Sequence, residues 1–383
     1  MPKKLLFPAL IIIFLVGLFF LLPKIFQSHY VSSASLFFSQ ATTTEKTVSS
    51  THIKTPDPVK GVYMTSWIAS AAYLRNPLVN LIQKTELNSV VIDIKDYSGR
   101  IVFPVTDPQL KAYGSEQVRV PDMQSFIQSL HQKGIYVIGR VAVFQDAYFV
   151  KYRPDLAVKN KAGTQVWKDR KGISWIDAGS KEYWDYIVLL AKQAHDIGFD
   201  EINFDYIRFP SDGNMEDISY PFSSTTPKSE VLKSFFAYLH DHLKDTGLVT
   251  SADLFGQTTI ATNDMGIGQV FVNALPYFDY VDPMVYPSHF GPGVFGYQNP
   301  EAHPYDMVYR SMKSGVAREK DLASTTGETL AVLRPWLQDF GLHQDYGPTE
   351  IKDQIQATYD DGLSSWLLWS ASNKYTEGAL ESK

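Results

Sequence analysis

The stretch EINFDYIRF, residues 201–209, has the alternation of a half-buried β-strand, yet it ends in acidic and basic residues. Successive side chains of a strand point to opposite faces. One parity carries Asn203 and Asp205, and the other carries Ile202, Phe204 and Tyr206. An unpaired buried charge is costly, so the acid predicts a polar cleft at the end of this strand.

Seven further β-rich runs extend this pattern along the chain: residues 61–67, 89–96, 136–144, 249–255, 280–286, 330–336 and 364–371. Helical periodicity lies between several of them, in segments that each close on a glycine: residues 120–134, 180–198, 229–247 and 347–362. Eight strands with intervening helices predict a (β/α)₈ TIM barrel. A doubly wound open sheet is the alternative, but the strand number and the absence of a glycine-rich phosphate loop from the sequence argue against it.

Other predicted strands also carry polar residues that could converge. The second strand has Asp93 and Lys95 on the parity opposite its apolar residues, the third has Arg140, the fifth has Asp253 and the sixth has Asp282. Barrel enzymes build their sites at the C-terminal ends of the strands. We therefore expect these side chains to meet at one mouth of the barrel, where Arg140 could neutralise a neighbouring acid.

Two of these acids fit the chemistry of glycosidic bond cleavage. That reaction uses one protonated carboxyl group for the leaving oxygen and one carboxylate as nucleophile or as base for water. Asp205 and Asp253 would face each other from adjacent strands. We expect Arg208 to keep Asp205 ionised and a drier setting to raise the pKa of Asp253. The reverse assignment and the stereochemical outcome stay open.

Aromatic and polar residues near the strand ends are the predicted substrate contacts. Aromatic residues make up 14% of the chain, and flat rings suit the apolar faces of sugars. The predicted contacts are Asp93, Lys95, Arg140, Tyr206, Arg208, Asp282, Tyr286, His289, Trp336 and Trp369. A metal-dependent polysaccharide deacetylase would need several histidines near strand ends, and only His289 is placed there. We expect neither a metal nor an organic cofactor.

The first residues predict export. Lys3 and Lys4 precede an uncharged apolar run, Leu5 to Leu22, that is roughly long enough to cross the core of a bilayer. The lysines favour a cytoplasmic N-terminus. We expect residues 1–28 to be an uncleaved membrane anchor with the remainder outside the cytoplasm. Cleavage near Ala34, followed by secretion, is the alternative.

The remainder divides into a linker and one domain. Residues 29–59 are rich in Ser and Thr, which predicts a flexible stalk. Residues 60–383 are expected to form the barrel. The net charge of −6, without a basic block in the domain, argues against nucleic acid as a partner. The absence of cysteine excludes disulfides and a thiolate nucleophile.

Several motifs together are similar to a known family. GVYMTSW, VVIDIKDYSGRIVFP, YVIGRVAVFQD, INFDYIRFPSDG, SADLFG and PMVYPSHF occur in this order. They resemble a family of glycoside hydrolase barrels catalogued as a domain of unknown function, distantly like barrels of α-amylase and α-galactosidase type. The resemblance implies a nucleophile at Asp205. It implies an acid at Asp253, where the amylase type has glutamate, or at Asp282, as in the α-galactosidase type.

The sequence therefore predicts a membrane-anchored glycoside hydrolase that acts on a cell-envelope or extracellular polysaccharide. The alternative is a carbohydrate-binding envelope scaffold without catalysis. An enzyme needs two carboxyl groups aimed into one cleft, whereas a binding protein needs only aromatic rings and hydrogen-bonding groups. The position of Asp205 and Asp253 discriminates between these two hypotheses.

Overall fold

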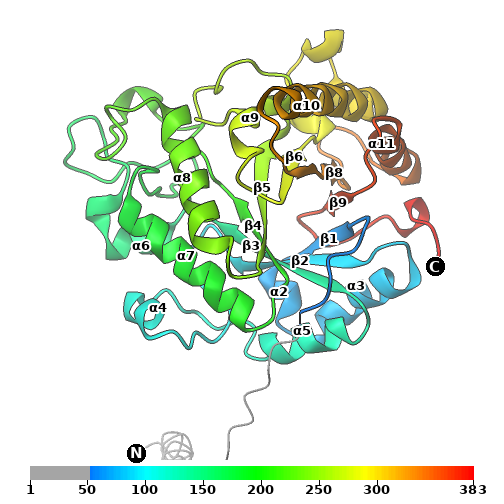
Figure 1. Ribbon diagram of the computed structural model, residues 1–383, viewed down its shortest axis with the longest axis horizontal. Coiled ribbons are helices and arrows are strands. Elements are labelled where there is room, and N and C mark those ends of the chain that lie inside the picture. The colour runs from blue at the N-terminus through cyan, green and yellow to red at the C-terminus, as the bar shows by residue number, and fades with distance from the viewer. Residues whose placement is uncertain (1–51) are drawn as a thin grey trace, which may run out of the picture. The chain divides into compact units, whose positions relative to one another are not determined.

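The computed structural model describes residues 52–383, which fold around a closed barrel of parallel strands (Figure 1). The strands are β1 (Lys60–Met64), β2 (Ser89–Lys95), β3 (Tyr136–Ala142), β4 (Glu201–Asp205), β5 (Val249–Phe255), β6 (Tyr280–Met284), β7 (Val332–Leu333), β8 (Trp336–Gln338) and β9 (Trp366–Trp369). They pair in the order β5-β4-β3-β2-β1-β9-β8-β6, and a β5–β6 pairing closes the ring.

The seventh position of the barrel is divided between two short strands. β7 and β8 both pair with β6, and β8 also pairs with β9. Pro335 lies between them and has no N–H to donate to a ladder, which accounts for the break. Counting this pair as one, the barrel has eight strand positions, so the predicted TIM barrel is confirmed and the open sheet is wrong.

The predicted strands are right in place, but most of them are too long at their C-terminal ends; the run 249–255 ends with β5, and β8 extends beyond the run 330–336. The run that was expected to continue through Trp67 stops at Met64, and Thr65 caps a short helix, α2 (Ser66–Ala69), by accepting from the N–H of Ile68. The run expected to reach Phe209 stops at Asp205. Where a strand stops early, the residues after it build the loops at the mouth of the barrel.

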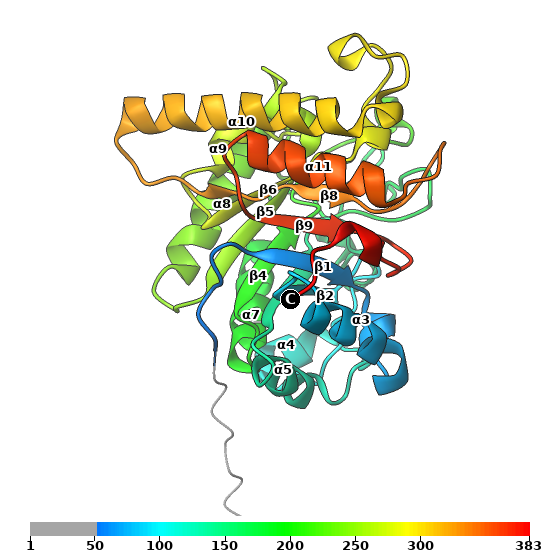
Figure 2. The same ribbon diagram turned by 90° about the vertical axis from the view of Figure 1, so that its right-hand side faces the viewer.

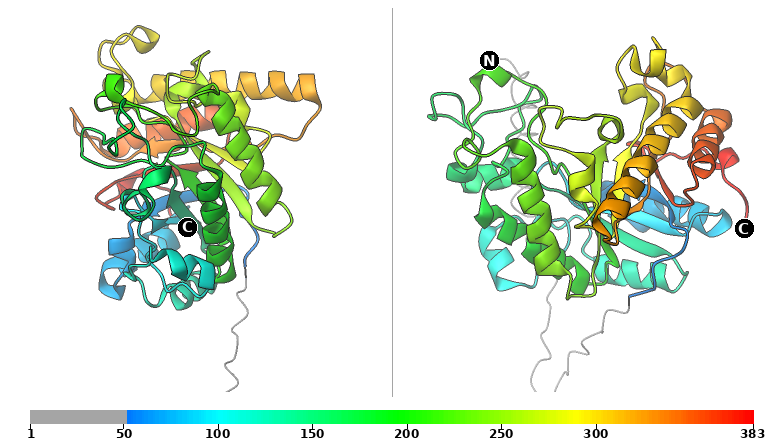
Figure 3. Two further views of the ribbon diagram at one scale, coloured as in Figure 1. Left: turned by 90° about the vertical axis from the view of Figure 1, so that its left-hand side faces the viewer. Right: turned by 45° about the horizontal axis from the view of Figure 1, so that its top comes forward.

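Helices surround the strands as the other layer of the fold (Figures 1 and 2). They include α3 (Ala72–Lys84), α4 (Pro108–Tyr113), α5 (Met123–His131), α6 (Ala147–Tyr152), α7 (Lys181–Asp196), α8 (Lys228–Leu243), α9 (Phe271–Ala274), α10 (Pro304–Thr326) and α11 (Pro348–Asp360). Helices α5, α7, α8 and α11 occupy the segments predicted from helical periodicity. Helix α10, which packs along α11, was not predicted (Figure 2), and α7 lies beside α8 (Figure 3).

Side-chain parity separates two cores, as predicted. Outward-facing residues of the strands, such as Ile92, Phe204 and Leu254, join the large apolar cluster under the helices. Inward-facing residues form a second, smaller cluster inside the barrel: Val59, Tyr63, Val91, Tyr136, Ile138, Tyr286, Trp336 and Leu367. The polar side chains on the same parity as this inner cluster therefore also point into the barrel interior. There they either pair with other residues or face a cavity.

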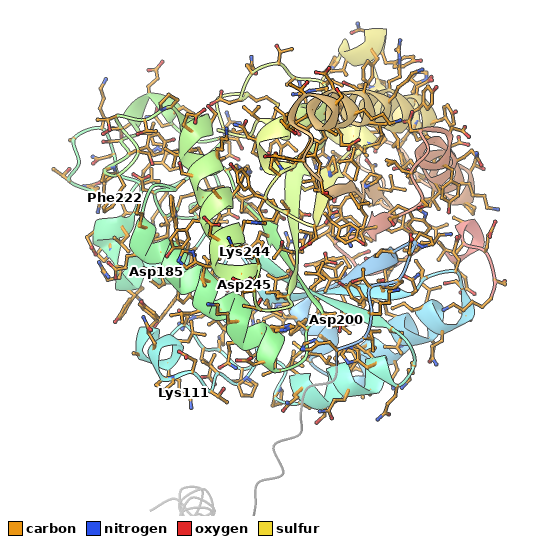
Figure 4. All side chains as sticks on the ribbon, in the orientation of Figure 1. Lys111, Asp185, Asp200, Phe222, Lys244 and Asp245 are labelled. Atoms are coloured by element: carbon orange, nitrogen blue, oxygen red, sulfur yellow. The ribbon has the colours of Figure 1, made fainter. Side chains whose placement is uncertain are left out.

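The N-terminal regions predicted from the sequence lie mostly outside the described residues. This applies to the anchor (1–28) and to the linker up to residue 51. Residues 52–59 contact the barrel domain: the backbone N–H of Ile53 donates to Asp200, which is labelled in Figure 4, at 2.9 Å. Among residues 52–383, no helix combines the length and apolar character needed to cross a bilayer.

Candidate active site

A cavity of about 330 Å³ opens at the C-terminal ends of the strands. Residues of β3, β4, β5, β6 and β9 and of the loops after them line it: Arg140, Asp205, Tyr206, Arg208, Asp253, Phe255, Gly256, Gln257, Met284, Tyr286, His289, Phe290 and Trp369. Both predicted catalytic acids are in this set, together with most of the predicted contacts. Ionisable groups and aromatic rings therefore share one concave surface, which is typical of ligand sites.

Asp205 is the last residue of β4, at the floor of the cavity, and is 7% exposed. Its Oδ1 accepts from the backbone N–H of Tyr206 at 2.5 Å. Tyr206 has a φ of 53°, in the left-handed region that a bulky residue rarely adopts. Such strained backbone gathers at functional sites. The strand thus ends in an abrupt turn that fixes the Asp205 carboxylate against the cavity.

Arg140, from the neighbouring strand β3, joins three carboxyl groups. Its Nη1 donates to Asp93 at 2.7 Å, its Nη2 donates to Asp205, and its Nε lies 3.9 Å from Oδ2 of Asp253. Burial lowers the pKa of Arg140, but Asp205 and Asp93 outweigh this and raise the pKa well above its ordinary value. Arg140 does pair with neighbouring acids, as expected: it hydrogen-bonds to Asp93 and Asp205, whereas it only approaches Asp253.

Asp253 occupies a drier position than Asp205, with 1% of its surface exposed. Its Oδ1 accepts from Asn203 at 2.8 Å and from the indole N–H of Trp336 at 2.7 Å. Burial, with Asp205 and Asp282 nearby, raises the pKa of Asp253 well above its ordinary value. Because both donors point at Oδ1, a proton on the neutral carboxyl group belongs on Oδ2, the oxygen nearer Arg140.

A second set of charged residues lies deeper in the barrel. Arg334 is fully buried, and it donates to Asp282 at 2.9 and 2.7 Å and to Glu201 at 3.2 and 2.5 Å. Burial raises the pKa of Asp282 to about 6, even though Arg334 acts in the opposite direction. Asp282 does not line the cavity. The structure therefore gives no support to Asp282 as a substrate contact or as the acid of the α-galactosidase pattern.

Three other predicted substrate contacts do not line the cavity, because they interact with buried partners. Lys95 is fully buried and pairs with Asp146 at 2.9 Å, which spares the ammonium an unpaired burial. Trp336 is fully buried behind Asp253. Asp93 lies behind Arg140 and also accepts from the hydroxyl of Tyr63. Lys95 belongs to a structural ion pair, whereas Asp93 positions Arg140 and Trp336 positions Asp253, both of which line the cavity.

Arg208 reaches the cavity but not the partner predicted for it. The expectation was that it would pair with Asp205, and Arg140 fills that role instead. The loop that follows Tyr206 carries Arg208 among the rings of Trp175, Tyr206 and Phe255. Three positions beyond Asp205, the side chain belongs to a loop rather than to the strand, so strand periodicity could not place it.

The remaining predicted contacts form the aromatic side of the cavity. Tyr286 and His289 pack edge to face with ring centroids 5.3 Å apart. Burial lowers the pKa of His289, and its Nδ1 lies 3.0 Å from the hydroxyl of Ser288. Trp369 stacks on Tyr63 at 4.0 Å between centroids. These rings offer flat apolar surface and a few polar atoms, which suits a sugar ring.

Several cavity residues were not predicted: Phe255, Gly256, Gln257, Met284 and Phe290. All of them lie at or just after the ends of β5 and β6. A Cβ at Gly256 would lie 2.4 Å from the carbonyl oxygen of Met284, so a larger residue would separate these two loops. Among residues 52–383, no group of three or more His, Asp or Glu side chains is arranged to hold a metal ion.

Three solved structures are similar to this chain, and the two with TM-scores above 0.5 share its fold. A protein of Ruminiclostridium thermocellum described as hypothetical is 33% identical over 50% of this chain and 96% of its own, with a TM-score of 0.46. The PgaB glycoside hydrolase domain of Bordetella bronchiseptica is 14% identical over 82% of this chain and 94% of its own, with a TM-score of 0.58. An alpha-galactosidase of Thermus thermophilus is 12% identical over 85% and 60%, with a TM-score of 0.51.

Comparison with curated proteins gave no match. A family model does match, over residues 61–375, which is nearly the whole barrel domain. The resemblance inferred from the motifs is thereby confirmed. The chain belongs to the family described as "Putative glycosyl hydrolase domain".

Proposed function

We propose that this protein is a glycoside hydrolase whose catalytic pair is Asp205 and Asp253. The observation that carries the proposal is that both carboxyl groups line one cavity at the C-terminal mouth of the barrel, where Arg140 pairs with Asp205 and its Nε lies 3.9 Å from Asp253. Catalytic residues of TIM-barrel enzymes lie at this mouth. Membership of the glycosyl hydrolase domain family supports the same reaction class.

The two environments assign different roles to the acids. Asp205 accepts from Arg140 and from a backbone N–H, which stabilise a carboxylate that attacks the anomeric carbon or activates a water. Asp253 has a raised pKa because it is buried, so it keeps a proton that it can give to the leaving oxygen. An acid whose pKa is raised by burial, placed opposite a second carboxyl group, is a usual arrangement for this chemistry.

The substrate we propose is a polysaccharide or oligosaccharide of the cell envelope or the extracellular space. The aromatic rings of Tyr286, Phe290 and Trp369 give the cavity walls on which sugar rings could stack. The location rests on the apolar run Leu5 to Leu22 after two lysines, which we propose anchors the domain outside the cytoplasm. Protease digestion of intact cells tests the location, since an exposed domain is degraded while a cytoplasmic one is protected.

Replacement of each acid tests the reaction. The full chain and its Asp205→Asn and Asp253→Asn variants are incubated with a panel of glycans, and new reducing ends are measured. Asp245→Asn serves as the matched control, because Asp245 is exposed and does not line the cavity. We expect turnover to be lost in the first two variants, with glycan binding retained, and to be unchanged in the control.

One observation favours the alternative, a carbohydrate-binding scaffold. Asp253 is only 1% exposed, so its carboxyl group needs a local rearrangement to reach a glycosidic oxygen. If the intact protein cleaves no glycan in the panel, and neither substitution changes binding, the scaffold replaces the hydrolase. Turnover by the intact protein that depends on both acids removes the scaffold.

A further inference from the structure

Arg208 is a cavity residue whose side chain is held in place by atoms that carry no net charge. Its Nη1 donates to the carbonyl oxygen of Phe209 at 3.2 Å and to the hydroxyl of Ser211 at 3.1 Å. The guanidinium carbon lies 4.9 Å from the ring centroid of Trp175 and 4.8 Å from that of Phe255. Hydrogen bonds and aromatic stacking therefore fix the orientation of the group without neutralising it.

The contrast with Arg140 is one of charge balance. Arg140 contacts the carboxyl groups of Asp93 and Asp205, whereas Arg208 forms no ion pair with any residue of the described range 52–383. Burial lowers the pKa of Arg208, which indicates that nearby acids do not fully compensate its loss of water. Arginine stays protonated under these conditions. The cavity thus contains a fixed positive charge that has no ion-pair partner among residues 52–383, although Asp205, Asp212 and Asp169 lie near enough to favour its charged form.

The free donors of Arg208 lie on one edge of the guanidinium. With Nη1 engaged by Phe209 and Ser211, Nε and Nη2 make no hydrogen bond to residues 52–383, and neither atom is sealed from solvent. These two nitrogens point their N–H bonds in parallel. A carboxylate accepts such a pair through both oxygens, which is the strongest arrangement an arginine can make.

We propose that the Nε–Nη2 edge of Arg208 binds a carboxylate borne by the substrate, so that the cavity takes an acidic glycan. The inference rests on the proposed function, because it assumes that a glycan occupies the cavity. The carboxylate belongs on a sugar close to the scissile bond, since Arg208 and both acids line the same cavity of about 330 Å³. A uronic acid or a lactyl ether on an amino sugar would each supply this group.

Binding of matched acidic and neutral glycans tests the proposal. The full chain carries Asp253→Asn, which we expect to stop turnover while the Asp205–Arg140 pair is kept. Dissociation constants are measured for a hyaluronan tetrasaccharide, for a peptidoglycan glycan tetrasaccharide freed of peptides, and for both after carboxyl reduction. The first probe carries uronates and the second carries lactyl ethers, so the probe that responds identifies the source of the carboxylate.

We expect at least one acidic probe to bind about tenfold or more tightly than its carboxyl-reduced form, as for a charge-assisted hydrogen bond. Arg208→Gln should abolish this preference. Arg208→Lys should keep only part of it, since lysine retains the charge without the paired donors. Lys320→Gln, which removes an exposed positive charge outside the cavity, should leave the preference unchanged.

The proposal is overturned if the reduced probes bind as tightly as the acidic ones, or if no acidic probe binds. It is also overturned if Arg208→Gln, folded by circular dichroism, keeps the full preference. A preference for the acidic probe in a protein that cleaves no glycan would retain Arg208 as a carboxylate site. That result would remove the hydrolase alone, so the two failures are distinguishable.

Discussion

Two layers of charged residues, each built from one arginine and its acidic partners, lie at different depths inside the barrel. In the upper layer Arg140 contacts Asp93 and Asp205 and approaches Asp253. In the lower layer Arg334 contacts Glu201 and Asp282. The upper layer opens into the cavity, whereas Arg334 is completely sealed.

This difference shows that the depth of a charged residue inside the barrel, rather than its type, decides whether it lines the cavity or forms a buried structural ion pair. Asn203 lies between the layers and donates to Asp253 at 2.8 Å and to Asp282 at 3.2 Å. Asp253 and Asp282 also lie directly opposite each other in the register of β5 and β6. Only Asp253 lines the cavity, because the stagger of strands in a barrel sets neighbouring side chains at different heights.

The lower layer should be the more sensitive to loss of its arginine. Arg334→Met leaves Glu201 and Asp282 buried without a cation, and removal of one partner from a buried pair costs about 3–5 kcal/mol. We expect urea denaturation to give a free energy of unfolding lower by about that amount. Arg153→Met is the control, because that arginine pairs at the surface and should change stability by about 1 kcal/mol or less. An unchanged midpoint in Arg334→Met would contradict a structural role for this layer.

A pH dependence of stability should distinguish Asp282 from its neighbours. Burial raises the pKa of Asp282 to about 6, from an ordinary value of 3.8. The folded protein therefore holds this proton more tightly than the unfolded chain does, and the resulting stabilisation is complete below about pH 4 and lost as pH rises towards about 6. The loss from this group is on the order of 3 kcal/mol.

Asp282→Asn cannot titrate, so the measurement is its free energy of unfolding relative to the unmodified protein between pH 4 and pH 7. The difference should shift in favour of the variant as pH rises through this window. A difference that is constant with pH would show that Asp282 has no raised pKa.

A substitution beside Asp253 in the upper layer should change the pH dependence of activity. Trp336 donates its indole N–H to Asp253, and a donor favours the charged form of a carboxyl group. Trp336→Phe removes the donor, so the pKa of Asp253 should rise further. An acid must be protonated to act, so the basic limb of kcat/KM should move to higher pH. A limb that stays in place would separate Asp253 from the general acid.

Sequence reasoning could predict the barrel and the inward direction of its acids, because strand parity and the helical segments are local patterns. Asp205 and Asp253 followed from parity and strand ends. Depth could not be predicted, since it depends on the relative stagger of strands that are far apart in the sequence. Asp282 and Trp336 were therefore assigned to the cavity although both lie behind it.

Ion pairs between side chains of different strands could not be predicted from the sequence either. Arg208 is close to Asp205 along the chain, but the left-handed turn at Tyr206 carries it into the following loop. Arg140 is 65 residues from Asp205, and the β3–β4 pairing brings their side chains together. Lys95 was assigned to the substrate, but its partner Asp146 lies beyond the end of β3, at the end of the motif YVIGRVAVFQD, where strand parity no longer predicts side-chain direction.

The most direct test of the account compares Asp205→Asn in the upper layer with Asp282→Asn in the lower layer. Reducing ends released from the glycan that the intact protein cleaves best are measured per folded molecule, with folding checked by circular dichroism. We predict a loss of roughly a thousandfold or more for Asp205→Asn. For Asp282→Asn we predict lower stability with activity within roughly tenfold of the intact protein. Activity that survives in Asp205→Asn, or vanishes in folded Asp282→Asn, would contradict the assignment of the site.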